Sequence, residues 1–154
     1  MKTFVVYDSE NGNTEEIAKA IGSAITGEVK LVHVSKANSA GLKAFDLLIV
    51  GSPTQGGRPT QAMQDFLDKI PGPAIKGIKV AAFDTRLTTR WVVIFGYAAD
   101  KIANDLASHG VTLIVAPEGF FVEGKKGPLE AGELERAAAW AKGITGDYSD
   151  RIAT

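Results

Sequence analysis

A polar, glycine-containing turn near the N-terminus has the residue types that bind a phosphate. The turn, residues 9–14 (SENGNT), lies between an apolar run at 4–7 and a segment whose apolar residues recur at helical spacing. Its hydroxyl groups, its backbone N–H groups and the positive end of the helix dipole would all favour an anion. The chain has neither the Gly-Lys-Ser/Thr of a nucleoside-triphosphate loop nor the G-x-G-x-x-G of a dinucleotide site. The turn therefore predicts a phosphate site made of hydroxyls and amides, without a lysine.

Five apolar runs that alternate with segments of helical periodicity must position this turn. Helices are predicted around 14–25, 63–70, 99–107 and 134–141, and the tail from Gly143 is expected to fray. Strands are predicted at 4–7, 29–34 (at a sheet edge), 46–52, 78–83 and 111–116; Pro117 breaks the last strand, which 120–122 could resume. The alternation predicts an α/β fold with a doubly wound parallel sheet and right-handed crossovers, as one domain over residues 1–154.

Three unusual loops are then expected beyond the carboxyl ends of the strands, where such sheets bind ligands. They are Asp8–Thr14, Ser52–Arg58 and Asp84–Tyr97. Because all three fall at one edge of the predicted sheet, we expect them to form a single binding site.

Composition excludes several classes of function. With 17 Lys+Arg against 18 Asp+Glu, the net charge of -1 gives no bulk attraction to nucleic acid or to an anionic membrane. The absence of cysteine excludes disulfides, thiol catalysis and iron–sulfur ligation by this chain. The first strand starts almost at Met1, and no apolar run approaches the roughly 20 residues of a membrane span. A cytoplasmic, soluble protein without a membrane span is expected.

The three loops, in this order, resemble those of the flavodoxin family. Ser9, Gly12 and Thr14 match the family's Thr/Ser-x-Thr-Gly-x-Thr phosphate loop, while Asn11 stands where a Thr is usual. Residues 51–57 (GSPTQGG) are similar to the family's second flavin-contacting loop, and 95–98 (FGYA) resemble its Phe-Cys-Gly-Ala. The fifth strand has no insertion, which is typical of the short-chain type.

The resemblance implies a five-stranded sheet in the order 2-1-3-4-5, with helices on both faces, and flavin mononucleotide (FMN) as the cofactor. The phosphate would lie on the 9–14 turn and the isoalloxazine ring between the second and third loops. The implied FMN-binding residues are Ser9, Glu10, Asn11, Gly12, Asn13, Thr14, Ser52, Pro53, Thr54, Gln55, Gly56, Gly57, Asp84, Thr85, Arg86, Trp91, Phe95 and Tyr97. The implied function is the transfer of single electrons between a reductase and an acceptor protein, with no catalytic residue and no metal.

Two features depart from the family pattern. The second loop has no aromatic residue, so flavin stacking would depend on Trp91, Phe95 or Tyr97, and Trp91 could equally pack against protein. The two loops expected at the ring contain Arg58, Arg86 and Arg90, against one acid, Asp84. Since cations stabilise anionic reduced flavin, we expect these arginines to raise the second reduction potential.

Two other readings stay open. The chain could be an FMN-dependent oxidoreductase that reduces a small acceptor such as a quinone or a porphyrin precursor, with 84–97 as a substrate lid. It could also be a flavodoxin-like interaction module that binds no flavin. A phosphoacceptor receiver domain is excluded, because the third strand ends in Val-Gly-Ser (50–52) without the necessary aspartate.

Overall fold

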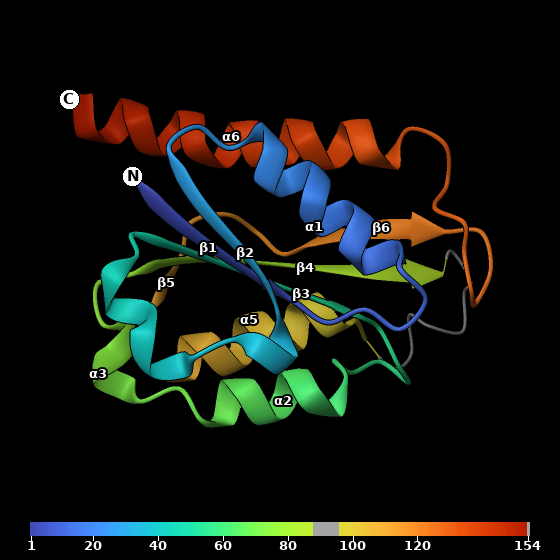
Figure 1. Cartoon of the computed structure of the whole chain (residues 1–154), viewed down its shortest axis with the longest axis horizontal. Helices are drawn as coiled ribbons and strands as arrows, with labels where there is room; N and C mark the ends of the chain where they lie inside the picture. Colours follow the sequence, from blue (N-terminus) through green and yellow to red (C-terminus); the bar gives the residue numbers. More distant parts are fainter. Residues whose placement is uncertain (88–95, 154) are drawn as a thin grey trace.

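The computed structural model describes residues 1–87 and 96–153, with side chains for 1–87 and 96–146. A parallel sheet in the order β2-β1-β3-β4-β5 runs through its centre, and β6 also pairs with β4 (Figure 1). The strands are β1 (Lys2–Tyr7), β2 (Glu28–His33), β3 (Leu47–Pro53), β4 (Lys79–Leu87), β5 (Thr112–Leu113) and β6 (Glu118–Val122). The predicted order 2-1-3-4-5 is confirmed, and so is the edge position of the second strand.

The fifth strand of the fold is interrupted, as the break at Pro117 predicts. β5 pairs with the start of β4, where Lys79 lies opposite Thr112. β6 pairs with the end of β4, from Phe83 opposite Glu118 to Leu87 opposite Val122. The two strands therefore lie one after the other along the same edge of β4.

Helices cover both faces of the sheet (Figure 1). α1 (Asn13–Ala24) and α6 (Glu133–Ala153) lie on one face. The other face carries α2 (Gln61–Asp68), α3 (Gly72–Ile75), α5 (Ala98–Ser108) and the short turns η1 (Val34–Lys36) and η2 (Ser39–Ala44). None of the described helices is long and apolar enough to cross a membrane.

The central strands are apolar on both faces because each face contacts a layer of helices. Val5 and Ile49 pack with α1 and α6, whereas Val6 and Val50 pack with the helices of the opposite layer. Alternate residues of one strand thus contribute to two separate cores. This packing holds the carboxyl ends of β1, β3 and β4 at one edge of the sheet.

Two predicted boundaries are wrong. β4 continues to Leu87, so residues 84–87 are strand, paired with β3 and β6, rather than loop. The last helix continues to Ala153 instead of fraying from Gly143. It is held by Ala137, Ala141 and Ile144, which are buried together on one helical face, whereas Leu134 is 42% exposed.

Candidate cofactor site

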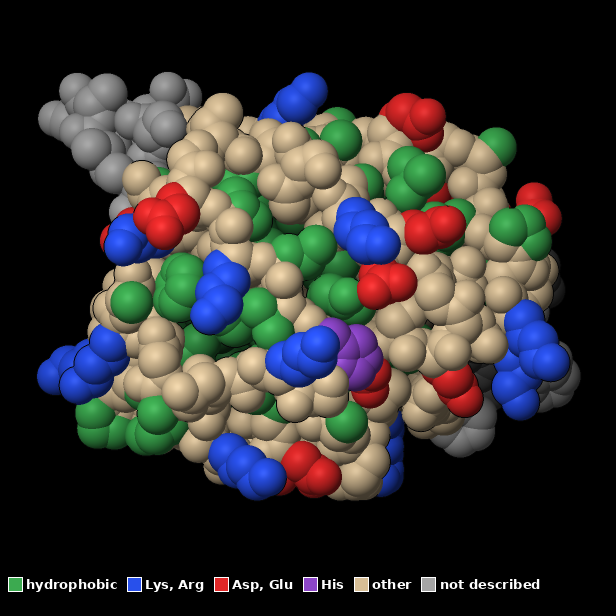
Figure 2. All heavy atoms as spheres, in the orientation of Figure 1, with side chains coloured by type: hydrophobic (Ala, Val, Ile, Leu, Met, Phe, Trp, Pro, Cys, Tyr) green, Lys and Arg blue, Asp and Glu red, His purple; other side chains and the backbone are tan. Residues whose placement is uncertain are grey.

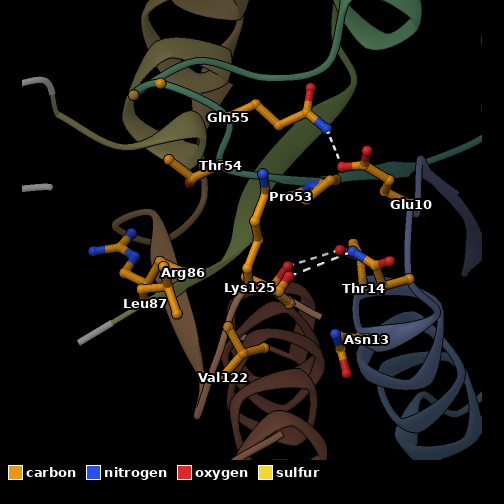
Figure 3. Close-up of a pocket in the computed structure, with 14 residues that line it drawn as sticks. Glu10, Asn13, Thr14, Pro53, Thr54, Gln55, Arg86, Leu87, Val122 and Lys125 are labelled. Carbon is orange, nitrogen blue, oxygen red and sulfur yellow. Dashed lines mark hydrogen bonds between the residues drawn. The ribbon is translucent and has the colours of Figure 1, made fainter. Parts of the chain in front are cut away.

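A cavity of about 600 Å³ opens at the carboxyl ends of the strands, between α1 and the loops that follow β3 and β6 (Figure 3). Its volume lies within the roughly 300–1,000 Å³ of small-molecule sites. The residues that line it are Glu10, Asn11, Asn13, Thr14, Pro53, Thr54, Gln55, Gly56, Gly57, Thr85, Arg86, Leu87, Val122 and Lys125. Eleven of these fourteen are among the FMN-binding residues that the family resemblance implied. The structure therefore brings the first two predicted loops together with the end of β4, where the third was predicted to begin.

The turn before α1 is built around Ser9 and Gly12. Gly12 has φ +90°, a left-handed conformation that favours glycine, and its position directly precedes the helix. The Ser9 hydroxyl oxygen accepts hydrogen bonds from the N–H groups of Gly12 (3.0 Å) and Glu15 (3.3 Å). Ser9 and Gly12 thus shape the turn and are not among the residues that line the cavity.

The first turn of α1 supplies the open donors of the site. The N–H groups of Asn13 and Thr14 belong to the first helical turn, where no intrahelical acceptor exists. Both residues line the cavity. An anion at this end of the cavity would meet these N–H groups and the positive end of the helix dipole.

Buried hydroxyl groups join this turn to the end of β4. Thr14 Oγ1 and Thr85 Oγ1 are 2.8 Å apart, and both side chains are buried. The hydrogen bond fixes the floor of the cavity between α1 and the sheet. It also brings together two predicted site residues that are 71 positions apart in the chain.

The second loop forms a tight turn over the cavity. Gln55 and Arg58 exchange two backbone hydrogen bonds (2.8 and 3.0 Å), and Gly56 and Gly57 between them both have positive φ. Gln55 Nε2 donates to Glu10 Oε2 at 2.6 Å, which links this loop to the turn before α1 (Figure 3). The Arg58 side chain is exposed and does not line the cavity.

Ser52 and Thr54 anchor the same loop at its base. Buried Ser52 accepts a hydrogen bond from the N–H of Thr60 and donates one to the Pro53 carbonyl, both at 3.0 Å. Thr54 Oγ1 accepts from the N–H of Ala98 at 3.0 Å. Ser52 thus positions the loop without reaching the cavity, whereas Thr54 connects the loop to α5.

The wall opposite α1 contains a closely paired acid and base. The Asp84 carboxylate is fully buried and accepts two hydrogen bonds from Arg86, at 2.7 and 2.8 Å, and one from the N–H of Ala99 at 2.9 Å. Burial raises the pKa of Asp84 above its ordinary value, although Arg86 and the Ala99 N–H act to lower it. The Arg86 guanidinium also stacks on the Tyr97 ring, 3.5 Å from its centroid.

Gly119 makes room for this pair. It lies directly opposite Asp84 in the β4–β6 register, and the Arg86 guanidinium occupies the space that a Cβ at position 119 would take. Asp84 and Tyr97 do not line the cavity, so they act on it through Arg86. Trp91 and Phe95, together with Arg90, lie outside the described residues.

Three cavity residues escaped the sequence reasoning. Leu87 and Val122 form an apolar part of the wall, and Lys125 lies in the loop that follows β6. The signal for Val122 and Lys125 was the last strand itself, since its carboxyl end reaches the same edge as the others, while Leu87 lies within the segment 84–97 that was expected at the site. Among the described residues, no cluster of His, Asp or Glu could hold a metal ion.

Proteins similar to this chain in sequence are flavodoxins. A family model described as a flavodoxin domain matches residues 4–91. A flavodoxin from Maridesulfovibrio salexigens is 27% identical over 153 residues, which cover 93% of this chain and 96% of that protein. A flavodoxin from Aquifex aeolicus is 35% identical over 75 residues, 46% of this chain and 40% of that protein.

A solved structure shares the whole architecture. The oxidised Flavodoxin 2 of Bacillus cereus superposes with a TM-score of 0.79 at 25% identity, over 96% of this chain and 99% of that one. The family model covers more than half of this chain, and the first two predicted loops meet the end of β4 at one cavity. This protein therefore belongs to the flavodoxin family of electron-transfer flavoproteins, whose members bind FMN.

Proposed function

We propose that this chain holds one FMN in the cavity and carries single electrons between a reductase and an acceptor protein in the cytoplasm. The observation that carries the proposal is the open first turn of α1 at one end of a cavity of about 600 Å³. The turn offers N–H donors to a phosphate. The rest of the cavity has both polar and apolar lining residues, which suit a ring system with polar edges.

The two ends of the cavity suit the two ends of FMN. The N–H groups of Asn13 and Thr14, with the Asn11 side chain, would hold the phosphate. The ring would lie between the turn at Gly56 and Gly57 and the wall formed by Leu87 and Val122. Bound FMN supplies the one-electron chemistry, while the protein orients it and limits its contact with water.

The charged groups of the cavity favour a carrier over an enzyme. Of the titratable side chains among the described lining residues, Glu10 is hydrogen-bonded to Gln55 and Arg86 is paired with Asp84. Glu10 and Lys125 form no ion pair with each other within 4.0 Å, so the described lining residues supply no acid–base pair in contact for proton transfer to a substrate.

The surface suits a partner that is not selected by bulk charge. Figure 2 shows acidic and basic side chains interspersed over one face of the molecule, in line with the net charge of -1. Long-range electrostatic steering would therefore contribute little to encounter. Recognition would depend on contacts near the cavity, where a partner can approach the flavin.

The test is an absorbance titration with FMN followed by stepwise anaerobic reduction. Asn13→Asp places a negative charge at the first helical position, where it stabilises the helix dipole but repels a phosphate. We expect it to weaken FMN binding by about tenfold or more. The matched control is Asn104→Asp on an exposed position of α5, which leaves binding unchanged.

The outcomes separate the readings. Flavin bands with a populated one-electron-reduced form support the carrier. Direct two-electron reduction, with turnover of NAD(P)H and quinones by the protein alone, would support the oxidoreductase instead. A wild-type protein that binds no flavin would leave only the interaction module.

A further inference from the structure

The loop that follows β6 is attached to the turn before α1. Asn11 Nδ2 donates to the Lys125 carbonyl at 3.4 Å, across 114 residues of sequence. Gly127 lies against the Asn13 amide, so closely that a Cβ at position 127 would come within 2.5 Å of Asn13 Oδ1. Two hydrogen bonds of 2.9 Å close the loop on itself, from Gly127 N–H to the Gly124 carbonyl and from Glu123 N–H to the Pro128 carbonyl. The backbone of Lys125 is thereby held beside the open end of α1.

The Lys125 side chain lines the cavity and points toward Pro53 in the loop that follows β3 (Figure 3). Among the described residues, it forms no ion pair within 4.0 Å. Lys126, the next residue, is exposed and does not line the cavity.

Two other charged side chains among the described residues line the cavity. Arg86 is held in two hydrogen bonds by the buried Asp84 carboxylate, and Glu10 accepts a hydrogen bond from Gln55. The Lys125 ammonium is therefore the unmatched cation among the described lining residues, attached to a flexible stem. Glu10, the acid that lines the same cavity, forms no ion pair with it within 4.0 Å, so the partner considered for Lys125 is an anion that enters with a ligand.

We propose that Lys125 is the cationic partner of the ligand's phosphate group and makes the cavity selective for a phosphorylated over an unphosphorylated flavin. The inference rests on the proposed function. A phosphate monoester carries about 1.5 to 2 negative charges near neutral pH. An oxidised isoalloxazine ring is uncharged, so the phosphate is the stronger attraction for an ammonium whose backbone lies beside the phosphate turn. The sequence predicts a phosphate site without a lysine. In the fold, Lys125 lies beside that site although it is 114 positions away from Asn11 in the chain.

The experiment compares FMN with riboflavin on Lys125→Ala and Lys126→Ala. The two variants lose the same charge at adjacent positions, but only Lys125 lines the cavity. We expect Lys125→Ala to raise the Kd for FMN by about tenfold at low ionic strength, less at high salt, and to leave the Kd for riboflavin unchanged. Lys126→Ala should change neither, and Lys125→Arg should retain most of the FMN affinity.

Three results would overturn the inference. An equal loss of affinity for FMN and riboflavin would show that Lys125 acts on the ring or on the shape of the loop. An equal effect of Lys126→Ala would reduce the role of Lys125 to general surface charge. Unchanged FMN binding in Lys125→Ala would refute the inference while wild-type binding still supported the proposed function, whereas a wild-type protein that bound neither flavin would overturn both.

Discussion

The two walls of the cavity satisfy their polar groups in opposite ways. At the start of α1, Asn13 and Thr14 line the cavity, and their N–H groups have no intrahelical acceptor. At the junction of β4 and α5, the Asp84 carboxylate accepts three hydrogen bonds and Arg86 is paired and stacked. The first wall, the open wall, has N–H donors that a ligand could bind, whereas the polar groups of the second, the matched wall, already have partners in the protein.

This difference assigns different roles to the two walls. N–H donors without an acceptor in the protein contribute binding energy, because the oxygens of an anionic ligand replace water as their acceptors. A matched pair contributes rigidity and little net charge. Arg86 is therefore expected to affect the reduction potential less than the sequence suggested, and Arg58 is exposed outside the cavity. The cation left facing the ligand, among the described residues, is Lys125.

The largest effect should come from breaking the matched pair. Asp84→Ala leaves the Arg86 guanidinium, whose side chain is 14% exposed, without its acid, and the Ala99 N–H without its acceptor. We expect the free energy of unfolding to fall by about 3 kcal/mol, measured by urea denaturation. The double variant Asp84→Ala/Arg86→Ala should be no less stable than Asp84→Ala alone. Additive losses would show that the two side chains do not act as a pair.

The pH dependence of Arg86→Ala tests the same pair from the other side. Burial raises the pKa of Asp84, and removing Arg86 removes the two interactions that chiefly oppose this rise. An acid whose pKa is raised in the folded protein contributes stability at low pH that is lost as the pH rises through the folded pKa. Arg86→Ala should therefore lose more stability than wild type as the pH rises above the ordinary pKa of an aspartate carboxyl. Parallel pH profiles would contradict the pairing.

The sequence predicted the open wall better than the matched one. The turn at 9–14 depends on the local spacing of its residues, so six consecutive residues were enough to predict a phosphate site. The end of β4 was predicted as a loop because Asp84 and Arg86 are polar. In the structure both are strand residues on one face: each is the hydrogen-bonding partner of the other, and Gly119 of β6, a neighbour in the sheet but far away in the sequence, leaves room for Arg86. The loop that contains Lys125 is attached to the turn before α1 by contacts with Asn11, 114 positions away, and with Asn13, which no local pattern encodes.

A smaller effect is expected where the two walls meet. Thr14→Val keeps the shape of the side chain but leaves the buried Thr85 hydroxyl without its partner at 2.8 Å. We expect a loss of about 2 kcal/mol in the free energy of unfolding, because an unsatisfied buried hydroxyl retains its desolvation cost. Thr14→Val/Thr85→Val should recover most of the loss, and Thr14→Ser should lose little. A double variant with the sum of the single losses would show that packing, rather than the hydrogen bond, joins the walls.

The smallest effect concerns the support of the open wall. The Tyr7 hydroxyl donates to Glu15 in the first turn of α1 at 2.7 Å, and burial, then Glu15, raises the pKa of Tyr7 to about 12 from 10.0. Because the folded pKa is the higher one, the stability that this tyrosine contributes is complete below pH 10 and is lost as the pH rises toward 12. Tyr7→Phe should cost about 1 kcal/mol at neutral pH, since Glu15 can still be hydrated.

Urea denaturation of wild type and Tyr7→Phe from neutral to alkaline pH checks this expectation, with Glu15→Gln as the control that keeps an acceptor and removes the charge. The stability curves of wild type and Tyr7→Phe should converge above about pH 10. Glu15→Gln should make the alkaline loss smaller and end it at a lower pH, because it lowers the folded pKa of Tyr7 and leaves the unfolded one unchanged. A constant difference between the first two curves would mean that Tyr7 supports the turn through packing alone. The open wall would then owe its geometry to Ser9 and Gly12, and the hydrogen bond to Glu15 would be incidental to the phosphate site.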